Sequence, residues 1–298
     1  MKIPKKHEFP LILSTGRVRI TGTGTGLFCF ALILGFVLTA GDRLEAHSDT
    51  ENITDDVENG GMEFSPGFEQ VSVDTLLYEE SVYPVSRLSQ PVVIDADWDK
   101  EPWSDIQSLY LGNHMGDDPD HRPDVHAKVA YDSEAIYVIF HVQDQYVRCV
   151  VEEHHGPVWT DSCVEFFFTP ETETEGYFNL ETNCIGTALF SYQNREEGIR
   201  SRISESDFES VDIAHSVSGV VDPEITDPVT WTLEYRIPFE LIARYTEMDH
   251  PAPGVEWKAN FYKIADNSSH PHWLTWSPVD HPEPNFHLPE FFGRLQFR

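Results

Sequence analysis

Short segments in which apolar and polar residues alternate recur from about residue 91 to the end of this 298-residue chain. Such alternation is typical of half-buried β-strands, because successive strand side chains point to opposite faces of a sheet. Turn residues separate several of these segments, as at Asp132-Ser133-Glu134 and Pro253-Gly254. Many short strands with few helices predict an all-β fold, either a sandwich or a barrel.

The alternation and the turn residues together place eleven strands and one short helix, the helix at residues 239–245. No fixed-period repeat is present, which argues against a solenoid or a propeller. The strands are expected at residues 91–95, 124–131, 135–142, 162–169, 177–183, 188–192, 213–219, 230–237, 256–264, 274–277 and 294–297.

The first 40 residues have a different composition from the rest. Five Lys and Arg side chains precede the apolar run at residues 27–38. This order is typical of a secretory signal peptide, and a retained membrane anchor is the alternative. Either interpretation exports the remainder to the periplasm, the cell surface or the medium, tethered in the second case. Residues 41–80 hold twelve acidic residues and one Arg, which predicts a disordered linker before a folded domain at residues 81–298.

The acidity of the chain lies almost entirely in the part that is expected to be exported. Of the 51 Asp and Glu residues, 50 lie after residue 40, together with 15 of the 20 Lys and Arg residues. A surface of this charge repels the phosphate backbone, so nucleic acid is excluded as a partner. Three cysteines also lie there, Cys149, Cys163 and Cys184, without metal-type spacing. One disulfide is compatible with export, and the pairing is open.

The segment at residues 159–168 carries two different strand faces. Val164, Phe166 and Phe168 share one face, which we interpret as core. The opposite face holds Asp161, Cys163, Glu165 and Phe167. An indole at Trp159 next to carboxylates suits a sugar, because ring faces stack on C–H groups while carboxylates accept bonds from hydroxyls. A solvated outer sheet face is the plainer interpretation.

A second strand, at residues 177–183, repeats this arrangement. Glu181 and Asn183 share one face, and Leu180 lies on the other. If this strand pairs with residues 162–168, then Glu165, Glu181 and Asn183 lie together on one polar face. Buried polar groups need partners, so such a face is either solvated or filled by a polar ligand.

Six motifs, in order over residues 83–298, resemble carbohydrate-binding module family 9, which is a DOMON-like β-sandwich. Each motif alone is weak evidence, and their shared order is what makes the resemblance specific. The motifs are Val93–Trp103, Val129–Phe140, Trp159–Phe168, Trp231–Pro238, Trp276–Pro278 and Phe286–Phe297.

The resemblance implies a jelly-roll-like antiparallel β-sandwich that binds carbohydrate without catalysis. In this family two aromatic rings sandwich a terminal sugar, which would assign the rings to Trp159 and Phe286. Glu165, Glu181 and Asn183 would bond the sugar hydroxyls. The family often has a basic residue where this chain has Glu181, and Phe286 stands where a larger Trp is usual.

Further expectations concern the edges of this site and its partners. Trp273 is the best candidate for an additional stacking platform, and His287 for a contact to sugar hydroxyls. The resemblance also implies structural calcium, although no motif fixes a calcium site. The expected partners are a saccharide and secreted glycoside hydrolases, with the protein accessory to polysaccharide breakdown.

Two other functions compete with sugar binding. Glu165 and Glu181 are paired carboxylates, which would suit a glycoside hydrolase. The 14 histidines raise the second alternative, a metal- or haem-binding DOMON-like sandwich, although no Met–His spacing stands out. The chain shows no nucleophile elbow, phosphate loop or zincin helix.

Overall fold

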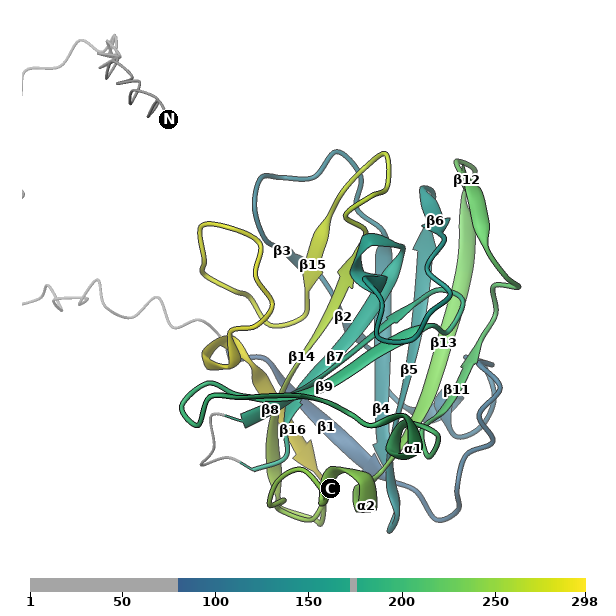
Figure 1. The fold of residues 1–298 in the computed structure, drawn as a ribbon. Helices are drawn as coiled ribbons and strands as arrows, with labels where there is room; N and C mark the ends of the chain where they lie inside the picture. The colour runs from purple at the N-terminus through teal and green to yellow at the C-terminus, as the bar shows by residue number, and fades with distance from the viewer. Residues whose placement is uncertain (1–79, 172–175) are drawn as a thin grey trace, which may run out of the picture. The chain divides into compact units, whose positions relative to one another are not determined.

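The computed structural model of the protein describes residues 80–171 and 176–298 (Figure 1). The predicted signal peptide or anchor and nearly all of the predicted acidic linker fall on residues 1–79, outside the described residues. Within the described ranges, no helix is both long enough and apolar enough to cross a membrane.

The described residues form an all-β domain, as predicted, with two short α-helices instead of one. The first eight strands are β1 (Val82–Arg87), β2 (Leu109–Tyr110), β3 (Asn113–His114), β4 (Asp124–Tyr131), β5 (Ala135–Asp144), β6 (Val147–Cys149), β7 (Cys163–Thr169) and β8 (Gly176–Asn183). The others are β9 (Ala188–Asn194), β10 (Ile199–Arg202), β11 (Asp212–His215), β12 (Val221–Ile225), β13 (Val229–Pro238), β14 (Glu256–Ile264), β15 (Trp273–Thr275) and β16 (Gly293–Phe297). The helices are α1 (Glu205–Phe208) and α2 (Phe239–Ile242), and single 3-10 turns are η1 (Trp103–Asp105), η2 (Val158–Thr160) and η3 (Pro289–Phe291).

The prediction of a strand at residues 91–95 is wrong. Pro91 has no backbone N–H to give to a ladder, and the backbone N–H groups of Asp95 and Ala96 donate to the carboxylate of Glu234 on β13, at 2.9 and 2.8 Å. Ala96 has a φ of 61°, which turns the chain out of the extended conformation. The segment is therefore a turn that a buried side chain holds in place.

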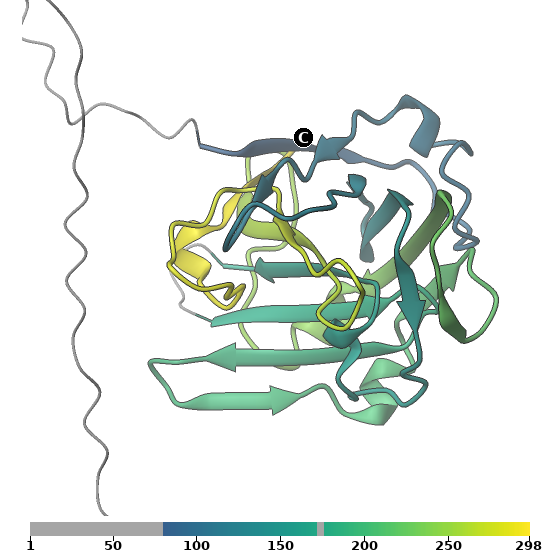
Figure 2. The ribbon, with the colours of Figure 1, turned by 90° about the horizontal axis from the view of Figure 1, so that it is seen from above.

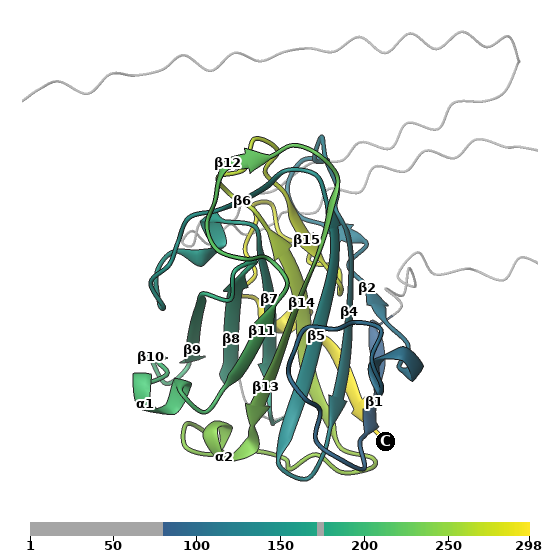
Figure 3. The same cartoon turned by 90° about the vertical axis from the view of Figure 1, so that its right-hand side faces the viewer.

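The strands build two facing layers that one strand joins (Figure 3). One layer runs β10-β9-β8-β7-β14-β16, and the other runs β4-β5-β13-β11. β1 lies between them, because its first half pairs with β16 and its second half pairs with β4, in parallel both times. The result is a sandwich with one closed side, and these two parallel pairings depart from the expected purely antiparallel arrangement.

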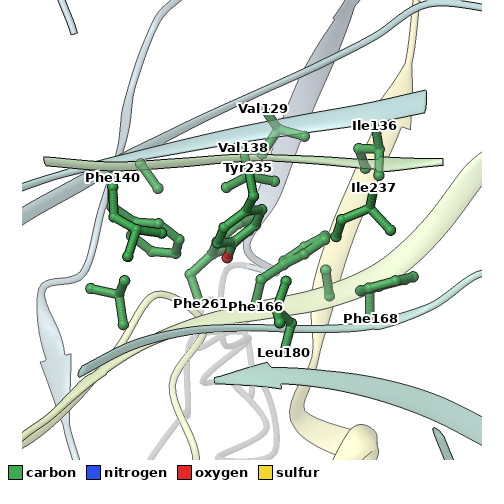
Figure 4. Close-up of a cluster of buried hydrophobic side chains, with 14 of the residues drawn as sticks. Val129, Ile136, Val138, Phe140, Phe166, Phe168, Leu180, Tyr235, Ile237 and Phe261 are labelled. Carbon is green, nitrogen blue, oxygen red and sulfur yellow. The ribbon is translucent and has the colours of Figure 1, made fainter. Parts of the chain in front are cut away.

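The core lies between the layers and is rich in aromatic rings (Figure 4). As the alternation predicted, Val164, Phe166 and Phe168 of β7 all point into it. The Phe166 ring stacks on Phe168 at 4.7 Å and on Phe261 of β14 at 4.9 Å between centroids. Each buried aromatic side chain contributes a few kcal/mol of hydrophobic stabilisation. The inward face of β7 is therefore committed to packing, which leaves its other face for a site.

The cysteines lie on both sides of this layer. Cys149 and Cys184 belong to the core, where the neighbouring Cys184 thiol and burial both raise the pKa of the Cys149 thiol. Cys163 belongs to a second apolar cluster on the opposite face of β7. All three are free thiols in this structure. Of the pairings that the sequence left open, the structure brings Cys149 and Cys184 together.

Candidate ligand-binding site

The strands of the first layer lie side by side (Figure 2), and their register aligns side chains in rows on the outward face of the layer. Alternation gives every second residue of β7, β8, β9 and β10 to this face. The rows are Tyr262, Glu165, Glu181 and Leu189; then Phe167, Asn179, Ser191 and Arg202; then Tyr177, Gln193 and Arg200.

These rows form the floor of a cavity of about 600 Å³. Small-molecule sites in proteins have volumes of this order. The walls come from the segments around Trp159 and Trp273 and from the loop that follows β15. Six of the seven predicted ligand residues line the cavity, namely Trp159, Glu165, Glu181, Trp273, Phe286 and His287.

Trp159 and Trp273 are the two half-buried indoles of the cavity, and one aspartate ties them together. Trp159 lies in η2, and its carbonyl accepts a bond from the backbone N–H of Asp266 at 3.3 Å. The Asp266 carboxylate accepts a bond from Trp273 Nε1 at 2.8 Å. The partial exposure of both rings leaves aromatic surface for a ligand, and the bonds to Asp266 restrict their movement.

Glu165 and Glu181 lie directly opposite each other in the register of β7 and β8. Both are almost completely buried, with 2% and 5% of their surface exposed. Asn179 Nδ2 donates to Glu181 at 2.9 Å, whereas no group of the described chain hydrogen-bonds to Glu165. The Glu165 carboxyl therefore retains its full hydrogen-bonding capacity for a ligand.

Burial is the main cause of a shift in the protonation of this pair. Burial, with the neighbouring charge of Glu181, holds the pKa of Glu165 well above its usual range. Burial raises the pKa of Glu181 to about 7, although Asn179 and Arg200 act in the opposite direction. Near neutral pH the pair holds at least one proton, so the floor offers both hydrogen-bond donors and acceptors.

This pair should make the stability of the domain fall as the pH rises. A carboxyl whose folded pKa exceeds its unfolded pKa stabilises the folded state fully at low pH, and this contribution is lost as the pH rises through the folded value. Between pH 4 and 8, we expect Glu181 alone to cost on the order of 2–3 kcal/mol, given its pKa of about 7. Chemical denaturation at a series of pH values measures this loss.

The uncharged isostere Glu181→Gln should gain on the order of 2–3 kcal/mol relative to wild type between pH 4 and 8 and should be more stable than wild type at pH 8, because the other titrating groups affect both proteins equally. Glu209→Gln, which changes an exposed carboxyl outside the cavity, is the matched control and should leave the slope unchanged. Parallel curves for wild type and Glu181→Gln would show that the buried carboxyl does not titrate in this range.

Phe286 lies in the cavity wall in a different way from the two tryptophans. Its ring stacks flat on Tyr262 at 4.0 Å between centroids and is only 7% exposed. One ring face is therefore covered by the protein itself. The structure thus offers two half-exposed indoles and one largely buried phenyl ring, rather than the two facing rings that the resemblance implies.

His287 follows Phe286 and lies between two polar side chains of the floor. Its Nδ1 is 2.9 Å from the hydroxyl of Tyr177 and 3.4 Å from Gln193 Nε2. Burial, together with the charges of Arg195 and Arg200, lowers the pKa of His287 to about 4. The ring is therefore neutral near pH 7 and can take part in hydrogen bonds without adding charge.

Asn183 lies outside the cavity, in contrast to the other six predicted residues. Its side chain is fully buried, and Nδ2 donates to Val151 O at 2.8 Å and to Asp161 Oδ2 at 3.0 Å. Its Oδ1 accepts the backbone N–H of Thr187 at 2.9 Å. With its amide fully engaged, Asn183 supports the loop that carries Trp159. Strand alternation placed it on the correct face but could not show that a loop covers that end.

Sequence reasoning missed Asp266, Arg200 and Arg202, which also line the cavity. Asp266 lies in the loop that follows β14, where no periodicity indicates the direction in which a side chain points. The two arginines alternate in Ile199-Arg-Ser-Arg202, a short strand pattern that could have indicated a polar sheet edge.

No group of three or more His, Cys, Asp or Glu side chains in the described part of the chain is arranged to hold a metal ion. The acidic turn at Asp95 is occupied by the ammonium of Lys100, which contacts the Asp95 carboxylate and lies 2.7 Å from Glu234 Oε2. Structural calcium therefore stays a prediction.

Comparisons with known proteins agree with this architecture. The structure of a protein from Bacteroides uniformis ATCC 8492, for which carbohydrate binding has been suggested, is 27% identical with a TM-score of 0.65. The match covers 74% of this chain and all of the other. A family 9 carbohydrate-binding module from Caldicellulosiruptor kristjanssonii, solved with glucose, is 14% identical with a TM-score of 0.50. It matches over 73% of this chain and 95% of its own, and it shows the fold alone.

No curated protein matches the sequence significantly. The family model described as carbohydrate-binding family 9 matches residues 94–297, which is more than two thirds of the chain. The matched range includes the segments that carry Trp159, Glu165, Glu181, Trp273 and Phe286. The chain therefore belongs to carbohydrate-binding family 9.

Proposed function

We propose that the protein is an exported, non-catalytic module that binds a saccharide in the cavity over β7, β8, β9 and β10. One observation carries the proposal: two half-exposed indoles, Trp159 and Trp273, stand beside the buried carboxyls of Glu165 and Glu181. A sugar ring has apolar C–H faces and polar hydroxyl edges, and this cavity offers a partner for each.

The position of the two carboxyls favours binding over hydrolysis. Glycosidases place their two carboxyls on opposite sides of the scissile bond, about 5 or about 6.5–9.5 Å apart. Glu165 and Glu181 instead project side by side from neighbouring strands of one sheet face. They present a single polar surface to one side of a ligand, which supports hydroxyl recognition.

The setting in which binding operates is also part of the proposal. The apolar segment at residues 27–38 and the acidic composition of the remainder support export, with the apolar segment as a signal peptide or a tether. An exported binding module fits a role accessory to polysaccharide breakdown, beside secreted glycoside hydrolases. The full chain fused to a reporter that is active only after export tests this part, and a reporter that stays inactive would contradict it.

A combined binding and product assay tests the function itself. We expect wild-type protein to bind at least one oligosaccharide on a glycan array, and calorimetry to give a 1:1 stoichiometry. We also expect mass spectrometry to recover the bound oligosaccharide intact after prolonged incubation. Binding to no saccharide would contradict the proposed function, whereas shortened products would show that the carboxyls act as a catalytic pair.

A further inference from the structure

Two arginines stand at one edge of the cavity, on the outermost strand of the layer (Figure 3). The register sets Arg200 of β10 opposite Gln193 of β9, and Arg202 opposite Ser191. Since residues two apart on a strand share a face, both guanidinium groups belong to the cavity side, about 7 Å apart along the strand. Both residues line the cavity and are exposed.

Neither guanidinium group has an ion-pair partner among the described residues. Six of the fourteen Lys and Arg side chains in the described ranges pair with carboxylates, namely Lys100, Arg122, Arg236, Arg244, Lys263 and Arg294. Arg200 and Arg202 are among the other eight, and both of them line the cavity. Two positive charges without a carboxylate partner in the described chain therefore stand on one strand face at the cavity edge.

The floor of the cavity does not cancel this positive charge. Burial raises the pKa of both Glu165 and Glu181, and the neighbouring charge of Glu181 adds to the effect at Glu165, so the pair does not carry two full negative charges near neutral pH. His287, in the same wall, is neutral. The cavity therefore has an aromatic end, a floor with few full charges and a cationic edge.

We infer that the ligand of this cavity is an acidic oligosaccharide, whose uronic acid carboxylate is bound by Arg200 and Arg202. This inference rests on the proposed saccharide binding and names its substrate class. The planar guanidinium group matches the geometry of a carboxylate and can bond it through two parallel N–H groups. The remaining part of the saccharide stacks on Trp159 and Trp273.

The dimensions of the sheet indicate that such a ligand has more than one sugar ring. Neighbouring strands are about 4.8 Å apart, so β7, with Glu165, and β10, with Arg202, are separated by about 14 Å across the sheet. Trp273 lies beyond β7, on β15, which pairs with β14. Trp159 lies in η2, next to β7 and β8, and its carbonyl is bonded to the loop that follows β14. A ligand that touches an indole and an arginine at once must span several strands, which one pyranose ring cannot do.

Matched ligands test the inference directly. Cellotriose and the trimer of β-1,4-linked glucuronic acid share one backbone and differ only in the group at C6. With the full chain, we expect calorimetry to show about tenfold or tighter binding of the acidic trimer. That preference should shrink between about 0.05 and about 0.5 M NaCl, because exposed charges are screened. A galacturonic acid trimer and a sulfated trisaccharide test ring configuration and sulfate esters.

Variants then assign the effect to the two side chains. The double variant Arg200→Gln/Arg202→Gln should lose the preference for the acidic trimer, so that the ratio of its affinities for the acidic trimer and for cellotriose falls from about ten or more to about one. Arg87→Gln is the control for each single variant, Arg200→Gln and Arg202→Gln, because it removes the same one positive charge. Arg87 is exposed on β1 outside the cavity and has no ion pair in the described chain.

Three results would overturn the inference. If wild-type protein binds cellotriose as tightly as the acidic trimers, or more tightly, the inference is refuted while the proposed saccharide binding stands. If the double variant still prefers the acidic trimer, the uronic acid carboxylate of the ligand is not bound by Arg200 and Arg202. Tighter binding of the sulfated ligand than of both uronic acid trimers would replace the carboxylate with a sulfate ester. If no saccharide binds, the proposed function falls as well.

Discussion

Replacing Trp159 by alanine is expected to weaken saccharide binding at least about 30-fold, which corresponds to about 2 kcal/mol. The partly exposed indole lines the same cavity as the Glu165 carboxyl, and its removal takes away stacking area and opens the cavity to water. Because Trp159 lies in a single 3-10 turn at the cavity wall, the fold should survive. Titration calorimetry of both proteins with the same oligosaccharide measures the loss.

Trp98→Ala is the matched control for this experiment. Trp98 is also half-buried, but it packs on the other layer, where the ammonium of Lys128 lies 3.9 Å from its ring centroid. Its loss should lower stability without changing affinity. Equal affinity of wild type and Trp159→Ala would show that the ligand does not stack on this ring.

Replacing Asp144 by alanine should cause the largest loss of stability, about 3–5 kcal/mol. Asp144 and Lys263 are fully buried and lie 3.4 Å apart, and His121 Nε2 lies 2.8 Å from the same carboxylate. Removal of the carboxylate leaves the Lys263 ammonium buried without its counter-charge, 2.7 Å from His272. For a domain of this size the loss corresponds to a decrease in the melting temperature of about 10 °C.

The dependence of this loss on pH distinguishes an electrostatic cause from a packing cause. Burial acts to raise the pKa of Asp144, but Lys263, His121 and His272 outweigh it and hold the pKa far below its usual range. A depressed carboxyl pKa stabilises the fold above the unfolded value of about 4, and this contribution disappears as the pH falls below it. Wild type and Asp144→Ala should therefore converge in strong acid.

Two further variants control for the buried pair. Asp124→Ala removes an exposed carboxylate, 3.0 Å from His126, and should cost less than about 1 kcal/mol. Asp144→Leu combined with Lys263→Met replaces the pair with apolar groups and should recover most of the lost stability. A double variant no more stable than Asp144→Ala would show that the uncompensated charge is not the cause.

Much of the fold could be predicted from the sequence, because its strands alternate cleanly. The face of β7 that holds Phe166 and Phe168 is the core face, as expected, and ten of the eleven predicted strands form. The prediction of a strand at residues 91–95 failed because of a long-range contact. The carboxylate of Glu234, more than 130 residues away in the sequence, accepts hydrogen bonds from two backbone N–H groups there. Six short strands were missed, namely β1, β2, β3, β6, β10 and β12, because two to six residues hold too few alternations to be distinguished from a loop.

The site could be predicted only in part, for a similar reason. Glu165 and Glu181 were expected on one face, and the register places them opposite each other. The sheet face to which a strand residue points follows from its position in the strand. Which other segments of the chain pack over that face does not. Asn183 therefore lies beneath a loop, and Phe286 is covered by Tyr262. Asp266 and the arginines of β10 line the cavity only because distant segments of the chain meet there, and these meetings are a property of the tertiary structure.

The position of β1 between β16 and β4 affects how the protein folds. Val82 pairs with Arg294, so the bridge between the layers joins residues more than 200 positions apart. Contacts of such long range make folding slow, because the chain entropy must be lost before the contact stabilises anything. Until β16 reaches β1, the folding chain keeps unpaired strand edges at the junction of its two layers. Such edges are prone to pair with other chains, so the time before the bridge closes is the time of greatest risk of aggregation.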